Sequence, residues 1–100
     1  MKQYSLIINS LAQSDLKIAA DWYAERKEGL DREFIFEIEK TIRQIIRNPE
    51  QFAFVRKKIR MAIVKRFPFG VYYYVIEDVI NVFAVFHFSR NPKVMRRRTK

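Results

Sequence analysis

The chain has 100 residues, enough for one hydrophobic core and too few for two, so a single domain is expected. An apolar fraction of 49% with 15% aromatic residues indicates a globular protein, even at a net charge of +9. The absence of cysteine excludes a disulfide framework, a thiolate metal site and a cysteine nucleophile. No signal-peptide pattern and no apolar run of about 18 residues is present, so we expect a reduced, cytoplasmic protein that does not bind membranes.

The positive charge lies almost entirely in the second half of the chain. Residues 1–50 carry eight basic and nine acidic side chains, a balance of −1, whereas residues 51–100 carry twelve and two, a balance of +10. Such segregation indicates a surface that meets a polyanion or an acidic protein, because clustered like charges repel one another unless a partner neutralises them. The alternative is that the basic side chains serve only solubility.

The first half predicts a strand followed by a helix. Residues 4–9 alternate in the manner of a short strand, and Ser10 with Gln13 has the spacing of a helical capping box. We expect this helix to end at Gly29. Its predicted buried stripe consists of Ala12, Leu16, Ala19 and Tyr23. Trp22 lies off this stripe and is assigned to the seam between two helices rather than to an exposed partner site.

A second helix is expected from a cap at Asp31 to Asn48-Pro49, so that the two helices form a hairpin. Its predicted stripe consists of Phe34, Ile38, Ile42 and Ile45. The acidic side chains of both helices are interpreted as a solvated face.

The second half predicts three strands, at residues 59–66, 69–76 and 80–88, the last two joined by a turn at Glu77-Asp78. The connections are too short for crossovers, so the strands must pair antiparallel. The predicted fold class is α+β, in the order β-α-α-β-β-β, with the helical hairpin on one face of a mainly antiparallel sheet. Residues 1–92 would form the domain, and residues 93–100 a mobile basic tail.

Candidate chemistry centres on basic side chains. The lone histidine, His87, excludes a multi-histidine metal site, and neither a metal nor a cofactor is expected. His87 shares the parity of Phe83 and Val85, so it is either a structural group among aromatic residues or a proton-transfer or phosphate-contacting residue beside Arg90.

The arginines form a second candidate group. Arg60 and Arg66 share one parity of the strand at residues 59–66, Lys65 takes the other, and Arg90 follows the last strand, so several could converge on one side of the sheet. Guanidinium groups bind phosphate and aromatic rings stack on bases, and this half holds ten of the fifteen aromatic residues. An aromatic core with a charged rim is the alternative.

Several strings, taken in order, resemble the RelE/ParE superfamily of bacterial type II toxins, which includes plasmid stabilisation proteins. They are A-x-x-D-L at residues 12–16, I-R-x-x-x-V-x-R-F-P-F-x-V-Y-Y at residues 59–73 and V-F-x-x-S-R-N-P at residues 85–92. The resemblance implies a growth-inhibiting toxin that a cognate antitoxin holds inactive by covering its apolar and basic surface. It also implies that the pair reaches operator DNA only through the antitoxin.

The superfamily divides by target. Its RelE-like members cleave mRNA on the ribosome with basic residues and a terminal tyrosine, which fall here at Gly70, Met61, Ile63 and Met95, so the donors that would stabilise a pentavalent phosphate are missing. ParE-like members, which poison DNA gyrase without catalysis, have an H-x-x-R string similar to residues 87–90. The resemblance therefore favours a gyrase poison.

Two alternatives to the gyrase poison stay open. One is a metal-independent mRNA endoribonuclease with His87, Arg90 and Arg66 as catalytic candidates, and the other is an inactive basic binding module. The residues expected to bind the target or the antitoxin are Lys57, Lys58, Arg60, Lys65, Arg66, Arg90, Arg96, Arg97 and Arg98.

Overall fold

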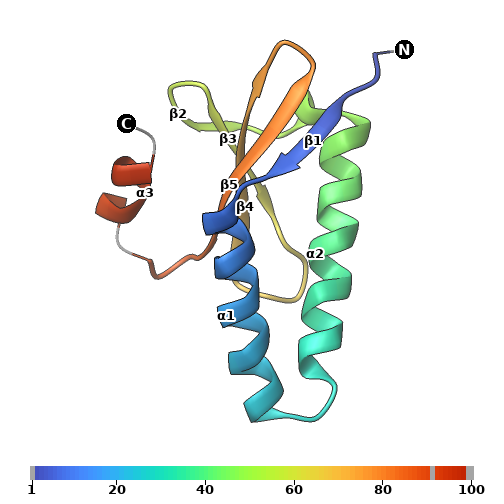
Figure 1. The fold of residues 1–100 in the computed structure, drawn as a ribbon, viewed down its shortest axis with the longest axis vertical. Coiled ribbons are helices and arrows are strands. Elements are labelled where there is room, and N and C mark those ends of the chain that lie inside the picture. The colour runs from blue at the N-terminus through green and yellow to red at the C-terminus, as the bar shows by residue number, and fades with distance from the viewer. Residues whose placement is uncertain (1, 91, 99–100) are drawn as a thin grey trace.

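The computed structural model describes residues 2–90 and 92–98 and contains a five-stranded sheet with a helical hairpin packed on one face (Figure 1). The elements in chain order are β1 (Ser5–Ile8), α1 (Ser10–Arg26), α2 (Leu30–Arg47), the 3-10 turn η1 (Pro49–Gln51), β2 (Phe54–Arg56), β3 (Ile59–Ile63), β4 (Phe69–Ile76), β5 (Val79–His87) and α3 (Pro92–Arg98). The predicted α+β fold class is confirmed. None of the helices in the described part is long and apolar enough to cross a membrane.

The strands lie in the order β1-β5-β4-β3-β2. β1 pairs parallel with β5, and every other neighbouring pair is antiparallel, as the short connections between β2, β3, β4 and β5 require. The three-residue edge strand β2 was not predicted, and β3 ends at Ile63 rather than at residue 66. In the structure Lys65 and Arg66 instead belong to the β3–β4 turn, where Arg66 has a positive φ of 70°.

The helix ends differ from the predicted ones by one to three residues. Asn9, not Ser10, caps α1, because its side-chain oxygen accepts the Ala12 N–H at 2.9 Å. Gln13 does reach back, but to the carbonyl of Ile8. Gly29 has a φ of 84° and is the N-cap of α2 rather than the end of α1, so Asp31 lies inside the first turn of α2, where a carboxylate is favoured by the helix dipole.

The main core lies between the hairpin and the sheet. The predicted stripe of α2 is buried throughout, and Phe34 packs its ring against Phe67 and Phe69. On α1 the buried apolar positions are Ala12 and Ala19, and Leu16 and Tyr23 of the predicted stripe are partly buried. Tyr73 of β4 is completely buried, and its hydroxyl donates to the carbonyl of Pro49 at 2.5 Å, which ties the end of α2 to the sheet.

A β-bulge in β5 changes which face its side chains occupy. Tyr72 pairs with Ala84 and Tyr73 with Val82, so Phe83 is an extra residue between them. Phe83 and Ala84 consequently belong to a second, smaller cluster on the opposite face, whereas Val85 returns to the main core. The expectation that His87 shares a face with Phe83 is therefore wrong, because a bulge shifts the alternation by one residue.

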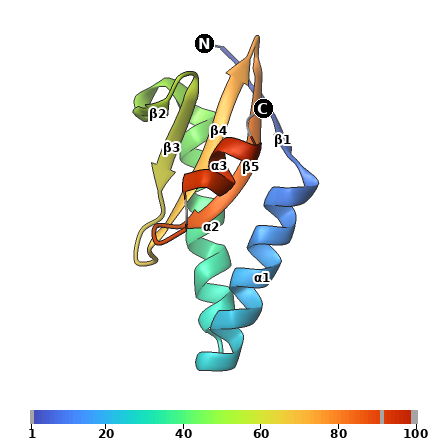
Figure 2. The same cartoon turned by 90° about the vertical axis from the view of Figure 1, so that its left-hand side faces the viewer.

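The sequence predicted a frayed tail from Lys93, whereas the structure has the short helix α3 over residues 92–98. Figure 2 shows α3 in front of the sheet, with α2 behind it. Val94 of α3 packs against the second cluster, which contains Ile59, Phe83, Ala84 and Phe86. Both faces of the sheet are thus covered, which explains why both parities of β4 and β5 are apolar.

Candidate functional site

A basic groove separates α3 from the β2–β3 turn, with a volume of about 920 Å³. It is lined by Arg56, Lys57, Lys58, Ile59, Tyr74, Lys93, Arg96, Arg97 and Arg98. The lining within the described residues contains no carboxylate. The term basic groove is used below for this set of residues.

The local chain geometry places two lysines at one wall of the basic groove. Lys57 and Lys58 form the two-residue turn between β2 and β3, and Lys57 has a φ of 45°. The Lys58 ammonium lies 5.0 Å from the centre of the Tyr74 ring, which in turn packs against Phe83 at 5.7 Å. The floor of the groove is therefore closed by side chains that already contact one another.

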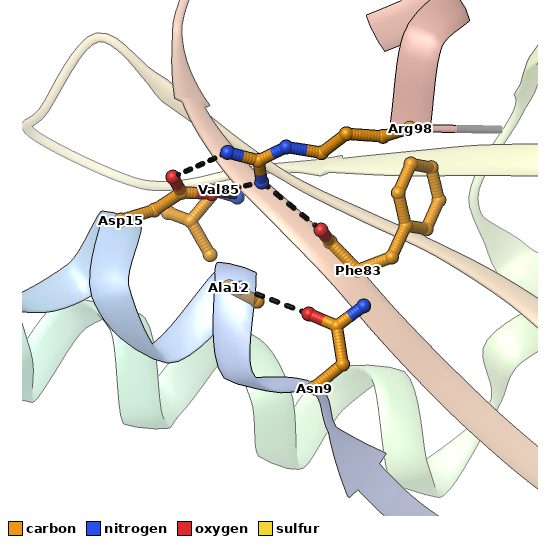
Figure 3. A network of polar contacts seen from close by, with 6 residues as sticks. All are labelled: Asn9, Ala12, Asp15, Phe83, Val85 and Arg98. Atoms are coloured by element: carbon orange, nitrogen blue, oxygen red, sulfur yellow. Dashed lines mark hydrogen bonds and ion pairs between the residues drawn. The ribbon is translucent and has the colours of Figure 1, made fainter.

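The other wall of the basic groove is α3, which a buried ion pair attaches to the rest of the fold (Figure 3). Two nitrogens of the Arg98 guanidinium bind the two carboxylate oxygens of Asp15 on α1 at 2.7 and 2.9 Å. The side chains of Asp15 and Arg98 are only 6% and 13% exposed. The guanidinium also lies 4.6 Å from the centre of the Phe86 ring, so both its edge and its face are in contact.

Asp15 was not recognised as a buried residue in the sequence, where the acidic side chains were interpreted as a solvated face. That interpretation is wrong for Asp15 and for Glu37, which are both buried. The helical spacing alone would have predicted the burial of Asp15, because it lies three residues after Ala12 and four before Ala19, on the same buried stripe. What the sequence could not provide was its partner, 83 residues away.

An apolar cleft of about 550 Å³ lies along α1. Its lining residues are Leu11, Ser14, Asp15, Ile18, Ala19, Trp22, Tyr23, Pro68, Phe69, Val85, His87, Arg90 and Arg98. Leu11, Ile18 and Trp22 are 51%, 67% and 50% exposed and follow one face of the helix. The assignment of Trp22 to the seam between the helices is thus wrong: its ring lies at the surface, with the Arg26 guanidinium 3.9 Å from its centre.

His87 and Arg90 both line the apolar cleft. Arg66 does not line it and instead lies against α2. His87 packs against Phe69 with ring centres 5.3 Å apart, and its Nδ1 lies 3.0 Å from the Ser89 backbone nitrogen, which donates to it. Arg66 binds Glu33 of α2 at 2.6 Å and lies 3.7 Å from Glu37. The hydrogen bond from Arg66 holds the pKa of Glu33 below its usual value.

The predicted binding residues divide among several surfaces. Five of them line the basic groove: Lys57, Lys58, Arg96, Arg97 and Arg98. The groove also includes Arg56 and Lys93, which were not among the predicted binding residues. Arg60 is engaged locally, because it donates to the carbonyls of Glu50 and Phe52. Lys65 is exposed in the β3–β4 turn. The predicted convergence of Arg60, Arg66 and Arg90 is therefore wrong.

The strand positions at which RelE-like nucleases have basic residues carry no hydrogen-bond donor side chain here. The side chain of Met61 covers Gly70, where a Cβ atom would lie 2.6 Å from the Met61 sulfur. Ile63 is 62% exposed and offers no donor. The fourth position, Met95, has a side chain outside the described part of the structure.

Comparison with known proteins places the chain in one family. The family model described as ParE toxin of type II toxin-antitoxin system, parDE, matches residues 6–92. Among solved structures, the chromosomal ParDE toxin–antitoxin system from P. aeruginosa superposes with a TM-score of 0.73, covering 85% of this chain and 96% of that chain at 19% identity, which shows a shared fold. A search of curated protein sequences gave no match. Since the family model spans most of the chain, the protein belongs to the ParE toxin family of type II toxin–antitoxin systems.

Proposed function

We propose that this chain inhibits bacterial growth by binding DNA gyrase, and that a cognate antitoxin holds it inactive by occupying the apolar cleft. Family membership supports a toxin with an antitoxin partner. The observation that favours target binding over RNA cleavage is the separation of the basic candidates. Arg66 is neutralised by two carboxylates of α2, while His87 and Arg90 border a largely apolar cleft.

A nuclease of this fold would need several donors around one phosphate. A pentavalent phosphate is stabilised by preorganised donors that surround it. Here Arg60 is held by backbone carbonyls, Arg66 by Glu33, and Met61 covers the place of a third-strand arginine. Binding of a protein target requires no such convergence.

The apolar cleft suits an amphipathic antitoxin segment. Trp22, Ile18 and Leu11 give it exposed apolar anchors, and Arg90 gives it a cationic rim. Interfaces of this kind derive most of their affinity from a few central aromatic and arginine residues. A bound segment would remove about half of the Trp22 surface from water.

Expression without antitoxin, combined with gyrase assays, tests the target. We expect growth arrest with intact transcripts. We also expect the purified toxin to inhibit the supercoiling reaction of purified gyrase. The His87→Ala and Arg90→Ala variants should be compared with Arg43→Ala, which removes an exposed cation on α2 outside both the groove and the cleft.

Three results would contradict the proposal. Ribosome-dependent mRNA cleavage that His87→Ala or Arg90→Ala abolishes, and Arg43→Ala retains, would identify a nuclease. Normal growth at a verified protein level would identify an inactive binding module. Growth arrest with normal supercoiling in the presence of the purified toxin would exclude gyrase as the target.

A further inference from the structure

We propose that the basic groove binds the phosphate backbone of duplex DNA, so that the toxin chain itself contacts DNA. This goes beyond the proposed function, which requires only protein partners, and it differs from the expectation that DNA is reached through the antitoxin alone. The groove carries seven basic side chains on two walls, from β2 and the β2–β3 turn on one side and α3 on the other. It lies away from the apolar cleft apart from Arg98, which lines both.

The first argument is that three cations of the basic groove have no acidic partner among the described residues. Arg56, Lys57 and Arg97 form no ion pair with any residue in the described part of the chain. The charge of Arg98, by contrast, is balanced by Asp15. Cations gathered in a concave surface repel one another and raise the local concentration of anions, so the arrangement favours a ligand of high negative charge density.

The second argument is the chemistry of the groove floor. Ile59 is 4% exposed, and the Tyr74 ring is covered by Lys58 on one side and packs on Phe83. No bare aromatic ring is therefore offered for stacking with unpaired bases, which is the usual contact of single-stranded nucleic acid. Duplex DNA keeps its bases stacked within the helix and presents phosphates, which Lys and Arg side chains bind directly.

The same floor argues against an acidic peptide as the ligand. A peptide gains affinity and specificity chiefly from apolar and aromatic anchors in pockets, with charges at the rim. Such anchors are available in the apolar cleft, at Ile18 and Trp22, and not in the basic groove. Protein partners and DNA are thus assigned to two different surfaces of one small domain.

The walls of the basic groove are held in place before any ligand binds. Lys57 and Lys58 are presented by a two-residue turn, and α3 is held by the buried contact between Arg98 and Asp15. A preformed arrangement loses less side-chain and backbone freedom on binding than a flexible tail would. The attachment of α3 through Arg98 therefore positions Arg97 opposite the turn.

The test measures binding of the purified toxin to a labelled duplex of about 20 base pairs by fluorescence anisotropy, over a range of salt concentrations. If four cations contact phosphates, log K should fall with log [salt] with a slope of about −3.6. The triple variant Lys57→Gln, Lys58→Gln, Arg97→Gln should lower the magnitude of the slope by about 2.7 and weaken binding about tenfold or more at low salt.

A control variant has the same change in net charge on another surface. Arg32→Gln, Arg43→Gln and Arg47→Gln remove three exposed cations of α2, and this variant should keep the affinity and the salt slope of the natural protein. Unfolding curves of both triple variants establish that each is folded. Equal weakening by the two variants would show a net-charge effect and overturn the proposal, as would failure of the natural protein to bind the duplex.

Two further ligands separate the alternatives. Tighter binding of a single strand of equal length would overturn the assignment to duplex DNA. Displacement of the duplex by poly-glutamate at an equal concentration of charge would assign the groove to an acidic peptide instead. Gyrase inhibition by the groove variant is measured separately, so loss of DNA binding with intact inhibition leaves the proposed function standing.

Discussion

The carboxylate of Asp15 and the guanidinium of Arg98 together bind the backbone groups along the edge of β5 that β1 leaves unpaired. Asp15 accepts the Val85 N–H at 3.0 Å, and Arg98 donates to the Phe83 carbonyl at 3.1 Å while the two side chains bind each other (Figure 3). β1 pairs with β5 only as far as Val82. The ion pair thus provides the hydrogen bonds that a longer β1 would otherwise make, and it fixes α3 to the edge of the sheet.

Loss of Arg98 should destabilise the fold strongly. In Arg98→Ala the Asp15 carboxylate stays buried with only the Val85 N–H to bind, and leaving one charge of a buried pair without its partner lowers the free energy of unfolding by about 3–5 kcal/mol. Arg97→Ala, one position earlier and exposed, should change it by less than about 0.5 kcal/mol. Urea denaturation followed by circular dichroism measures both, and equal stability of the two variants would show that the ion pair contributes little.

Truncation after Pro92 removes the contact between Asp15 and Arg98 together with most of α3. The sequence pattern suggests that residues 93–100 can be removed without effect, because only Val94 and Met95 are apolar. The structure predicts instead a loss at least as large as that of Arg98→Ala, since α3 also covers Phe83 and Phe86. The added change Asp15→Asn should restore part of the stability of the truncated chain by removing the unpaired charge. Cooperative unfolding at the natural urea midpoint would contradict this prediction.

Titration of Tyr73 should destabilise the protein at high pH. Burial raises the pKa of Tyr73 to about 12. The unfolded chain has the ordinary pKa of about 10, so stability is complete below pH 10 and falls as the pH rises toward 12, by at most about 1.4 kcal/mol per pH unit for this group. Tyr73→Phe removes the contribution of Tyr73 to this slope. It also leaves the Pro49 carbonyl without its donor, which lowers stability at pH 7 by about 1–3 kcal/mol. Unfolding at pH 7 and pH 11 separates the two effects, and an unchanged slope in the variant would refute the assignment to Tyr73.

Replacement of Trp22 should weaken antitoxin binding without affecting the fold. The ring is half exposed and contacts Tyr23 and Arg26, so Trp22→Ala removes a proposed interface anchor rather than a core residue. Loss of a central aromatic anchor costs about 2 kcal/mol or more, which is a loss in affinity of about 30-fold. Phe36→Ala is the matched control, since Phe36 is an exposed aromatic residue of α2 outside the apolar cleft. Calorimetric titration with the antitoxin would contradict the prediction if both variants bound equally.

The order of the elements, the buried stripe of α2, the positive charge of the second half and the family resemblance could all be predicted from the sequence. Each of these properties depends on the local sequence. The period of the apolar residues distinguishes helix from strand, and the short connections after residue 58 require antiparallel pairing. The strings at residues 59–73 and 85–92 carry the resemblance to the RelE/ParE superfamily, which the family match confirms.

Only the tertiary structure decided which side chains meet. The bulge at Phe83 reverses the facing of the residues around it, and no local pattern marks the position of a single extra residue. Asp15 and Arg98 are 83 residues apart, so their contact depends on how α1, β5 and α3 are packed together. The sequence by itself thus determined that the second half is basic and that the chain resembles one toxin superfamily. Within the described residues, the packing decided which of the basic side chains form ion pairs and which stay unpaired at the surface. Arg98 forms a buried ion pair and Arg66 an exposed one, whereas Lys57, Lys58 and Arg97 lie along the basic groove, where we propose that they contact DNA.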